Sequence, residues 1–228
     1  MNRTVNVIRM QLINRQTFIW LPLIILGASF LMSLAIYAMI PVDGPKYGGG
    51  AQAPLWYFLA VGVQAMTLSF PFSQALSITR REFYLGTLLT AVLTSVILAA
   101  VFVVGGFLEQ ATNGWGLNGW FFRLPWVWEQ GPAAAAVVYF GVAMLLFVVG
   151  FGCALLYKRF GALGLTLTLV GIGVLLVAAM YLVGRANAWA ALFEWIMTQG
   201  ALGLSLWGLL LAAVIAVASF FTLRRATP

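Results

Sequence analysis

The chain has 228 residues, of which 63% are hydrophobic and only 7% are charged, and its mean hydropathy is +1.02. Water-soluble globular proteins carry about 25% charged residues, so this composition excludes an ordinary soluble domain. The net charge of +7 comes from short basic segments between apolar runs, which argues against nucleic acid as a partner.

The first predicted element is an interfacial helix at residues 1–16. Val5, Ile8 and Leu12 recur on one helical face, whereas Arg3 lies on another. A basic amphipathic helix favours the surface of a membrane that contains anionic lipid. We therefore expect membrane lipid to be a partner of this segment.

Six apolar runs follow, and each is long enough to cross a bilayer as a helix, which takes about 20 residues. In lipid, backbone N–H and C=O groups must bond within their own segment, so we predict an all-α integral membrane protein. The whole chain, 1–228, forms one transmembrane domain, with a bundle over 17–222 and a tail at 223–228. The predicted spans are residues 17–40, 54–76, 86–108, 132–156, 162–184 and 200–222.

Charge patterning orients this bundle. The two ends of the chain and the alternate loops between them hold nine basic residues and one acidic residue. The other three loops hold three basic and four acidic residues. Because short loops rich in Lys and Arg stay in the cytoplasm, we predict a multi-pass protein of the cell membrane with both termini cytoplasmic.

A short polar segment, SITRREFYLG at residues 77–86, separates the second and third predicted spans. It is too short to fold alone and lies on the predicted cytoplasmic side. Its charged residues can pair with a soluble partner, and its aromatic residues can serve as anchors in a partner's pocket. The residues concerned are Arg80, Arg81, Glu82, Phe83 and Tyr84.

The residue types that the chain lacks exclude several kinds of catalytic and binding site. The chain has no histidine and one cysteine, Cys153, so a zinc site or an intrachain disulfide lacks ligands. It also lacks the P-loop motif. Glu109, at the end of the third span, is the acid nearest the membrane interior, and we interpret it as an interfacial carboxylate. We expect no enzyme activity, metal or cofactor in the chain itself.

Hydroxyl and amide side chains inside the spans are candidates for lining a transport pathway. Hydrogen bonding between helices is the simpler interpretation of any single one of them. Pro71 interrupts the second span and allows a kink there, because proline lacks an N–H. Glycines such as Gly150 and Gly171 permit close helix contact. The candidate lining residues are Ser29, Ser33, Tyr37, Gln64, Thr67, Ser69, Ser73 and Gln74.

The segment at residues 186–199 has a helical apolar pattern between the last two spans. Its apolar residues recur at i, i+3, i+4 and i+7. We expect a short amphipathic helix that dips back into the outer leaflet, although an aromatic belt at headgroup level would also suit its tryptophans. The residues of this re-entrant element are Trp189, Leu192, Phe193, Trp195 and Ile196.

Together, the amphipathic N-terminal segment, the six spans and the motif TRREFYLGTLL at residues 79–89 resemble the permease subunits of type-2 ABC exporters. The resemblance implies that the first inner loop forms a coupling helix in a groove of a separate ATPase. It implies that residues 3–15 form a connecting helix and residues 186–199 a re-entrant element. The coupling residues that it implies are Ile78, Thr79, Arg80, Arg81, Glu82, Phe83 and Tyr84.

The same resemblance implies an assembly of two six-span subunits, either two copies of this chain or this chain with a sibling permease. Two ABC ATPase subunits, which bind ATP and Mg, complete the expected complex. The expected function is therefore that of the membrane subunit of an ATP-driven exporter. Its cargo is open, and lipids, amphiphilic peptides or drugs would all suit an apolar cavity with hydroxyl and amide groups.

Two other classes share the hydropathy pattern. A six-span substrate-binding subunit of a vitamin importer has the same length, but the first span, GASFLMSLAIYA, lacks an Ala-xxx-Ala docking pattern. A passive channel is the third possibility, although the spans contain no rings of charged residues. Tight binding of one vitamin, or flux without ATP, would favour these alternatives.

Overall fold

The computed structural model describes residues 3–42 and 44–223, so most of the predicted tail at 223–228 lies outside it. The described chain is helical apart from one pair of two-residue strands, β1 and β2. Within these residues, five helical stretches are long and apolar enough to cross a membrane, which confirms the prediction of an all-α membrane protein. They are Gln16–Met39, Gly50–Ala75, Arg80–Ala111, Pro132–Arg185 and Trp189–Leu223.

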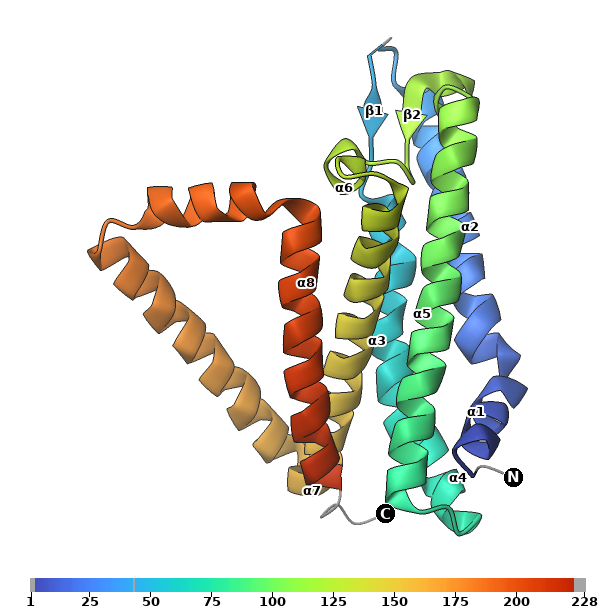
Figure 1. Ribbon diagram of the computed structural model, residues 1–228, viewed down its shortest axis with the longest axis vertical. Helices are drawn as coiled ribbons and strands as arrows, with labels where there is room; N and C mark the ends of the chain where they lie inside the picture. The colour runs from blue at the N-terminus through green and yellow to red at the C-terminus, as the bar shows by residue number, and fades with distance from the viewer. Residues whose placement is uncertain (1–2, 43, 224–228) are drawn as a thin grey trace.

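The elements follow one another in a simple up-and-down order (Figure 1). The first half of the chain contains α1 (Arg3–Ile13), the π-helical turn η1 (Gln16–Trp20), α2 (Leu21–Met39), β1 (Lys46–Tyr47), the 3₁₀ turn η2 (Gly50–Gln52), α3 (Ala53–Gln64), the π-helical turn η3 (Ala65–Ser69) and α4 (Phe70–Ala75). The second half contains α5 (Arg80–Ala111), the turn η4 (Gly114–Asn118), β2 (Gly119–Trp120), α6 (Pro125–Trp128), α7 (Pro132–Arg185) and α8 (Trp189–Leu223).

The long helices lie side by side and give the bundle two distinct ends (Figure 1). One end carries α1, α4, the start of α5 and the end of α8, and we refer to it as the terminal end. The other carries β1 and β2, and we refer to it as the strand end. The segments with the excess of basic residues, as far as they are described, therefore gather at one end.

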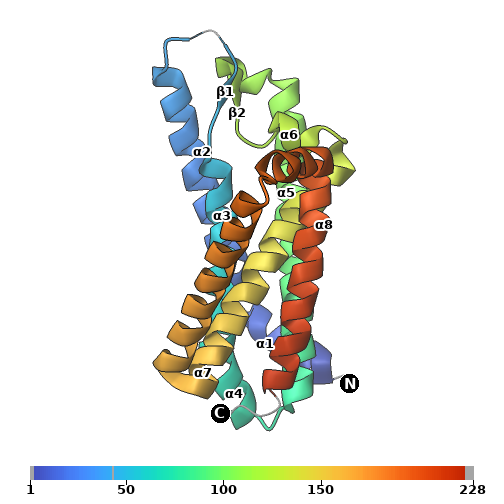
Figure 2. The same ribbon diagram turned by 90° about the vertical axis from the view of Figure 1, so that its left-hand side faces the viewer.

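Helix α7 is one stretch of 54 residues that contains two predicted spans. A straight helix of that length would measure about 80 Å, far more than the bilayer core of about 30 Å. Gly161 breaks it with φ +71° and ψ −174°, a conformation open to glycine. Residues 132–160 form a first arm inside the bundle, and residues 162–185 form a second arm that leans away from it (Figure 1). The two arms meet at the terminal end (Figure 2).

Helix α8 is divided in the same way. Gly200, at φ +60°, separates a first arm at residues 189–199 from a second arm at 201–223. The first arm runs crosswise at the strand end, and the second returns along the bundle to the terminal end (Figure 1). The predicted helix within 186–199 is therefore present and begins at Trp189.

The core forms where α3 and the first arm of α7 touch backbone to backbone. A Cβ atom added at Gly62 would lie 2.1 Å from the Phe147 carbonyl oxygen, and one at Gly150 would lie 2.0 Å from that of Leu59. Such close approach is typical of membrane helices that meet through small residues. Fully buried phenylalanines, among them Phe58, fill the space around this contact.

Both π-helical turns in the long helices precede a proline. Pro22 follows η1, and Pro71 follows η3, at the same spacing. Proline lacks an N–H and its ring clashes with the carbonyl four residues earlier, so the preceding turn widens. The predicted irregularity at Pro71 is thus confirmed as a widened turn, whereas its counterpart before Pro22 was not predicted.

Glu109 holds the connection at the strand end together. Its side chain is fully buried and its two oxygens accept hydrogen bonds from the Trp115 indole and from three successive backbone N–H groups. Glu109 lies near the end of its helix, as predicted, but its carboxylate is enclosed by the chain itself, which was not predicted. The donors of the backbone bonds are Phe121, Phe122 and Arg123, at 2.7–2.9 Å.

Candidate functional site

The candidate site is the α4–α5 turn, residues 76–79, together with the first turn of α5. Thr79 begins the helix as its N-cap: its hydroxyl accepts from the Glu82 N–H at 3.3 Å, and its own N–H donates to Glu82 Oε2 at 3.1 Å. This capping box satisfies two N–H groups that a helix start leaves unpaired. Glu82 therefore fixes the start of α5.

The other side of the turn is braced from α4. The Gln74 amide donates to the Ile78 carbonyl at 3.1 Å, and the Ile78 N–H donates to the Ser73 carbonyl at 3.1 Å. Ser77, between them, has a left-handed φ of 57°. The turn is thus held on both sides by hydrogen bonds to α4 and to the start of α5.

Phe83 and Tyr84 point into the bundle. Phe83 has no exposed surface and packs against the Phe70 ring, with centroids 5.2 Å apart. The Tyr84 hydroxyl donates to the Ala216 carbonyl, and its ring lies between Phe151 and Phe220. The prediction that these two residues are exposed anchors for a partner is wrong in this structure, because both side chains already fill the chain's own core.

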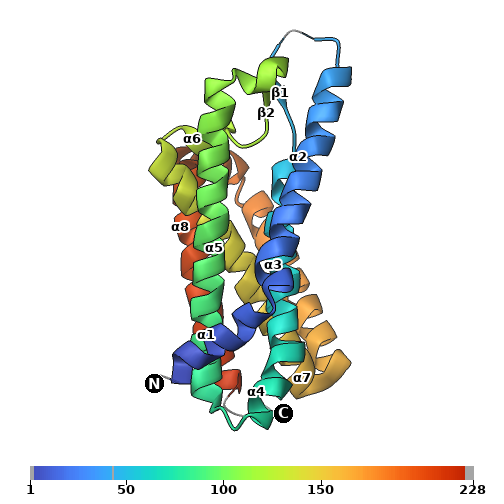
Figure 3. The same ribbon diagram turned by 90° about the vertical axis from the view of Figure 1, so that its right-hand side faces the viewer.

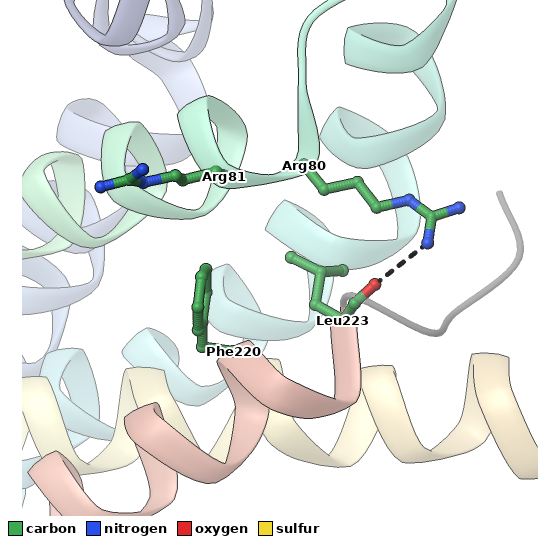
Figure 4. A pocket seen from close by; sticks show the side chains of 4 residues that line it. All are labelled: Arg80, Arg81, Phe220 and Leu223. Atoms are coloured by element: carbon green, nitrogen blue, oxygen red, sulfur yellow. Dashed lines mark hydrogen bonds between the residues drawn. The ribbon is translucent and has the colours of Figure 1, made fainter.

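The surface that remains is small and basic. Thr79 and Arg81 are exposed, whereas Ile78, Arg80 and Glu82 are half-buried. Arg80 donates to the Leu223 carbonyl at 3.4 Å, and Figure 4 shows Arg81 pointing the other way. These two arginines line a cavity of about 520 Å³ together with Phe220 and Leu223. Of the predicted coupling residues, Arg81 is the charged one best placed to meet a partner.

Helix α1 packs across α5 immediately beyond this turn (Figure 3). Val7 is fully buried, and a Cβ atom added at Gly86 would lie 2.5 Å from its Cβ. Gln11 Nε2 donates to the Thr87 hydroxyl at 2.8 Å. Gly86 and Thr87, which belong to the motif at residues 79–89, therefore form the surface on which α1 packs. This contact was not predicted.

The face of α1 that docks on α5 differs from the apolar face read from the sequence. Val7 and Gln11 form the docked face, whereas Val5 is exposed and Ile8 and Leu12 are half-buried. The predicted helix is confirmed, but its predicted apolar face is only partly exposed, because Leu12 packs against the core.

The eight candidate pathway residues do not meet in one cavity of the described chain. The hydroxyls of Ser29, Thr67 and Ser73 bond to carbonyls of their own helices. Ser33 and Tyr37 are buried towards the strand end, where the Tyr37 hydroxyl donates to Trp120. Gln74 braces the α4–α5 turn. Gln64 and Ser69 line a separate groove beside α1.

The first arm of α8 carries the five residues of the predicted re-entrant element. Leu192 and Ile196 are half-buried, whereas Trp189, Phe193 and Trp195 are exposed. The Trp195 ring lies 6.2 Å from that of Trp207 on the second arm. This arm is therefore an amphipathic helix with an apolar face largely uncovered by the chain.

The described residues contain no group of three or more histidine, cysteine or acidic side chains that could hold a metal ion. No protein-family model matches the chain, and no curated protein or solved structure is significantly similar to it. The site must therefore be interpreted from its own geometry.

Proposed function

We propose that this chain is the membrane-spanning subunit of an ATP-driven exporter of the type-2 ABC class. In this proposal it forms half of a substrate pathway and docks a separate ATPase at the α4–α5 turn. One observation carries the proposal: a braced, basic turn is exposed at one end of the bundle and connects two helices of membrane-spanning length without a flexible linker.

The proposed mechanism follows from that connection. ATP binding changes the shape of the ATPase pair, and the turn moves with it. Because α4 and α5 are joined rigidly to the turn, they tilt as one body and switch the pathway between inward- and outward-facing states. The ATPase drives the switch only if it binds the two states with different affinity.

The proposed topology has six crossings. If α7 crosses the membrane once on each side of Gly161, the chain returns to the terminal end and both termini are cytoplasmic. The first arm of α8 is then the re-entrant element, at the outer surface. Support comes from the basic residues of the described terminal end and from the apolar face of that arm.

A partner permease is also part of the proposal. The second arm of α7 has exposed apolar side chains all along its length, including Leu163, Leu175 and Leu182. A Cβ atom added at Gly171 or Gly173 would meet no atom of the chain within 4 Å. This arm supports a second copy, or a sibling subunit, as the neighbour that completes the pathway.

The topology is tested by accessibility of single cysteines, after the native Cys153 is replaced by alanine. We expect cysteines at Lys46 and Arg185 to react with an impermeant maleimide in intact cells. A cysteine at Lys158 should react only after the membrane is permeabilised, because it lies beside the Gly161 turn. Reaction at position 158 in intact cells would contradict the six-crossing topology.

The coupling role is tested by reversing the charge of Arg81. The complex is purified after co-expression with the ATPase of a neighbouring reading frame. We expect Arg81→Glu to weaken ATPase binding about 2- to 10-fold and to make it more salt-sensitive, because an exposed ion pair contributes about 0.2–1 kcal/mol and its reversal adds repulsion.

Arg185→Glu is the matched control, since Arg185 is also exposed but is the last residue of the second arm of α7, at the strand end. Equal effects of the two variants would contradict the coupling site. Failure of any ATPase to bind or to power transport would contradict the exporter itself.

A further inference from the structure

A groove beside α1 has the features of a ligand site that the proposed transport function does not use. It has a volume of about 180 Å³ and lies between the α1–η1 segment and the α3–η3–α4 segment. Its walls are Met10, Gln11, Asn14, Thr17, Phe18, Gln64, Leu68, Ser69 and Phe72.

Gln11 gives the groove a buried polar group with spare hydrogen-bonding capacity. The residue is 2% exposed, and its Nε2 is used by Thr87. Within the described residues, no group donates to its Oε1. An amide oxygen buried without a donor is destabilising, so a ligand that supplies the missing hydrogen bond is stabilised by removing that cost.

Both π-helical turns of the long helices face this groove. Thr17 and Phe18 belong to η1, and Leu68 and Ser69 belong to η3. A widened turn displaces side chains from the regular helical positions, and such turns are frequent at functional sites. Pro22 and Pro71 specify the two turns, so the sequence itself builds the two opposing walls.

The residues that line the groove, and its volume, limit the charge and the size of a ligand that can bind there. None of the nine lining residues is charged, so a phosphate or ammonium group here would lack a counter-ion. The volume is smaller than the range of about 300–1,000 Å³ that holds a whole small molecule. It suits a headgroup, while Leu68 and Phe72, both largely exposed, offer an apolar surface outside it.

We propose that this groove binds a membrane lipid with an uncharged, hydroxyl-bearing headgroup, such as a diacylglycerol. The hydroxyl enters between Gln11, Gln64 and Ser69, where it can both donate and accept hydrogen bonds. The acyl chains lie along Leu68 and Phe72. The bound lipid links α1 to the α3–α4 segment and so steadies both next to the α4–α5 turn. Binding requires only that the chain lie in a membrane and is independent of the ATPase.

The test uses two lipids that differ in one group: diolein, and the same lipid with its free hydroxyl capped as a methyl ether. Binding to the purified chain in phosphatidylcholine nanodiscs is measured by native mass spectrometry without any ATPase. We expect diolein to bind at least about fivefold more tightly, the effect of one net hydrogen bond. Equal binding of the two lipids would overturn the proposal, as would displacement of diolein by free glycerol.

Variants of the lining residues test whether the preference for diolein over its methyl ether arises in this groove. Gln64→Leu with Ser69→Ala should weaken the preference for diolein, because it removes two of the three polar groups around the hydroxyl, and should leave Gln11 and its contact with Thr87 in place. Thr67→Ala is the matched control, because Thr67 lies in the same turn but bonds to the Val63 carbonyl and does not line the groove. A weakened preference in the control, or an undiminished preference in the double variant, would overturn the proposal.

A measurement on the unaltered chain guards against misfolded variants. Diolein with a photoreactive diazirine in one acyl chain should crosslink to Leu68 or Phe72, and unlabelled diolein should suppress the crosslink. Crosslinks confined to other helices would overturn the site, and would leave the exporter proposal untouched.

Discussion

Glu109→Ala is expected to unfold the connection between α5 and α7 at the strand end. The substitution removes the acceptor of four hydrogen bonds, two from the buried N–H groups of Phe121 and Phe122 and two from the partly buried N–H groups of Arg123 and the Trp115 indole. Each buried group left without a partner costs about 1–3 kcal/mol, so we expect a loss of at least about 2 kcal/mol in the free energy of unfolding. Thermal unfolding in detergent, followed by tryptophan fluorescence, measures the effect.

Two further variants make the test of Glu109 specific. Glu129→Ala removes an exposed carboxylate from the same connection and should leave the unfolding temperature unchanged. Glu109→Gln keeps one acceptor oxygen and should fall between the two alanine variants. Limited proteolysis should cut the Glu109→Ala protein within residues 113–123. If this protein unfolds like the Glu129→Ala control, the carboxylate does not hold the connection.

Hydropathy was sufficient to predict the helical segments because the requirement for about 20 apolar residues acts on each segment by itself. The predicted spans at 54–76 and 86–108 fall within Gly50–Ala75 and Arg80–Ala111 apart from the last residue of the former. The predicted spans at 132–156 and 162–184 occupy the two arms of α7. Gly161 separates these arms, and one glycine among many in the sequence carries no mark of its left-handed φ.

The direction of a side chain depends on neighbours that are distant in the sequence. Phe83 and Tyr84 follow two arginines, and that pattern suits an exposed anchor as well as a buried ring. Their actual surroundings, Phe70 and Phe220, come from α4 and α8. Only the three-dimensional packing decides between these outcomes, which is why the proposed coupling surface is reduced to the turn and Arg81.

Buried polar groups were missed for the same reason. Glu109 was predicted at a helix end, but its four donors lie 6–14 residues away in a loop with no regular pattern. Gln11 is one polar residue in an amphipathic helix, and its partner Thr87 is 76 residues away. Gln64 and Ser69, which line the groove, were predicted as pathway residues, but nothing in the sequence places them beside α1.

Substitutions at two glycines of α7 test two different things: Gly150 tests the stability of the single chain, and Gly171 tests its assembly with a partner. At Gly150 a Cβ atom would lie 2.0 Å from the Leu59 carbonyl oxygen, and backbone cannot move aside as a flexible side chain can. Gly150→Ala should therefore force α3 and α7 apart, at a cost of about 1–3 kcal/mol or more in the free energy of unfolding. Gly171→Ala should leave the unfolding of the single chain unchanged, since a Cβ atom there meets nothing within 4 Å.

A larger substitution at Gly171, on the second arm of α7, is expected to affect assembly and not stability. Membrane helices associate through small residues that let their backbones approach, so a bulky side chain at Gly171 should obstruct a partner copy seated on this arm. We expect Gly171→Leu to unfold at the same temperature as the unaltered chain, while mass measurement in nanodiscs shows two chains per particle falling to one. An unaltered dimer in Gly171→Leu would place the partner elsewhere. A Gly150→Ala protein as stable as the Gly171→Ala protein would contradict the backbone contact between α3 and α7 on which the bundle depends.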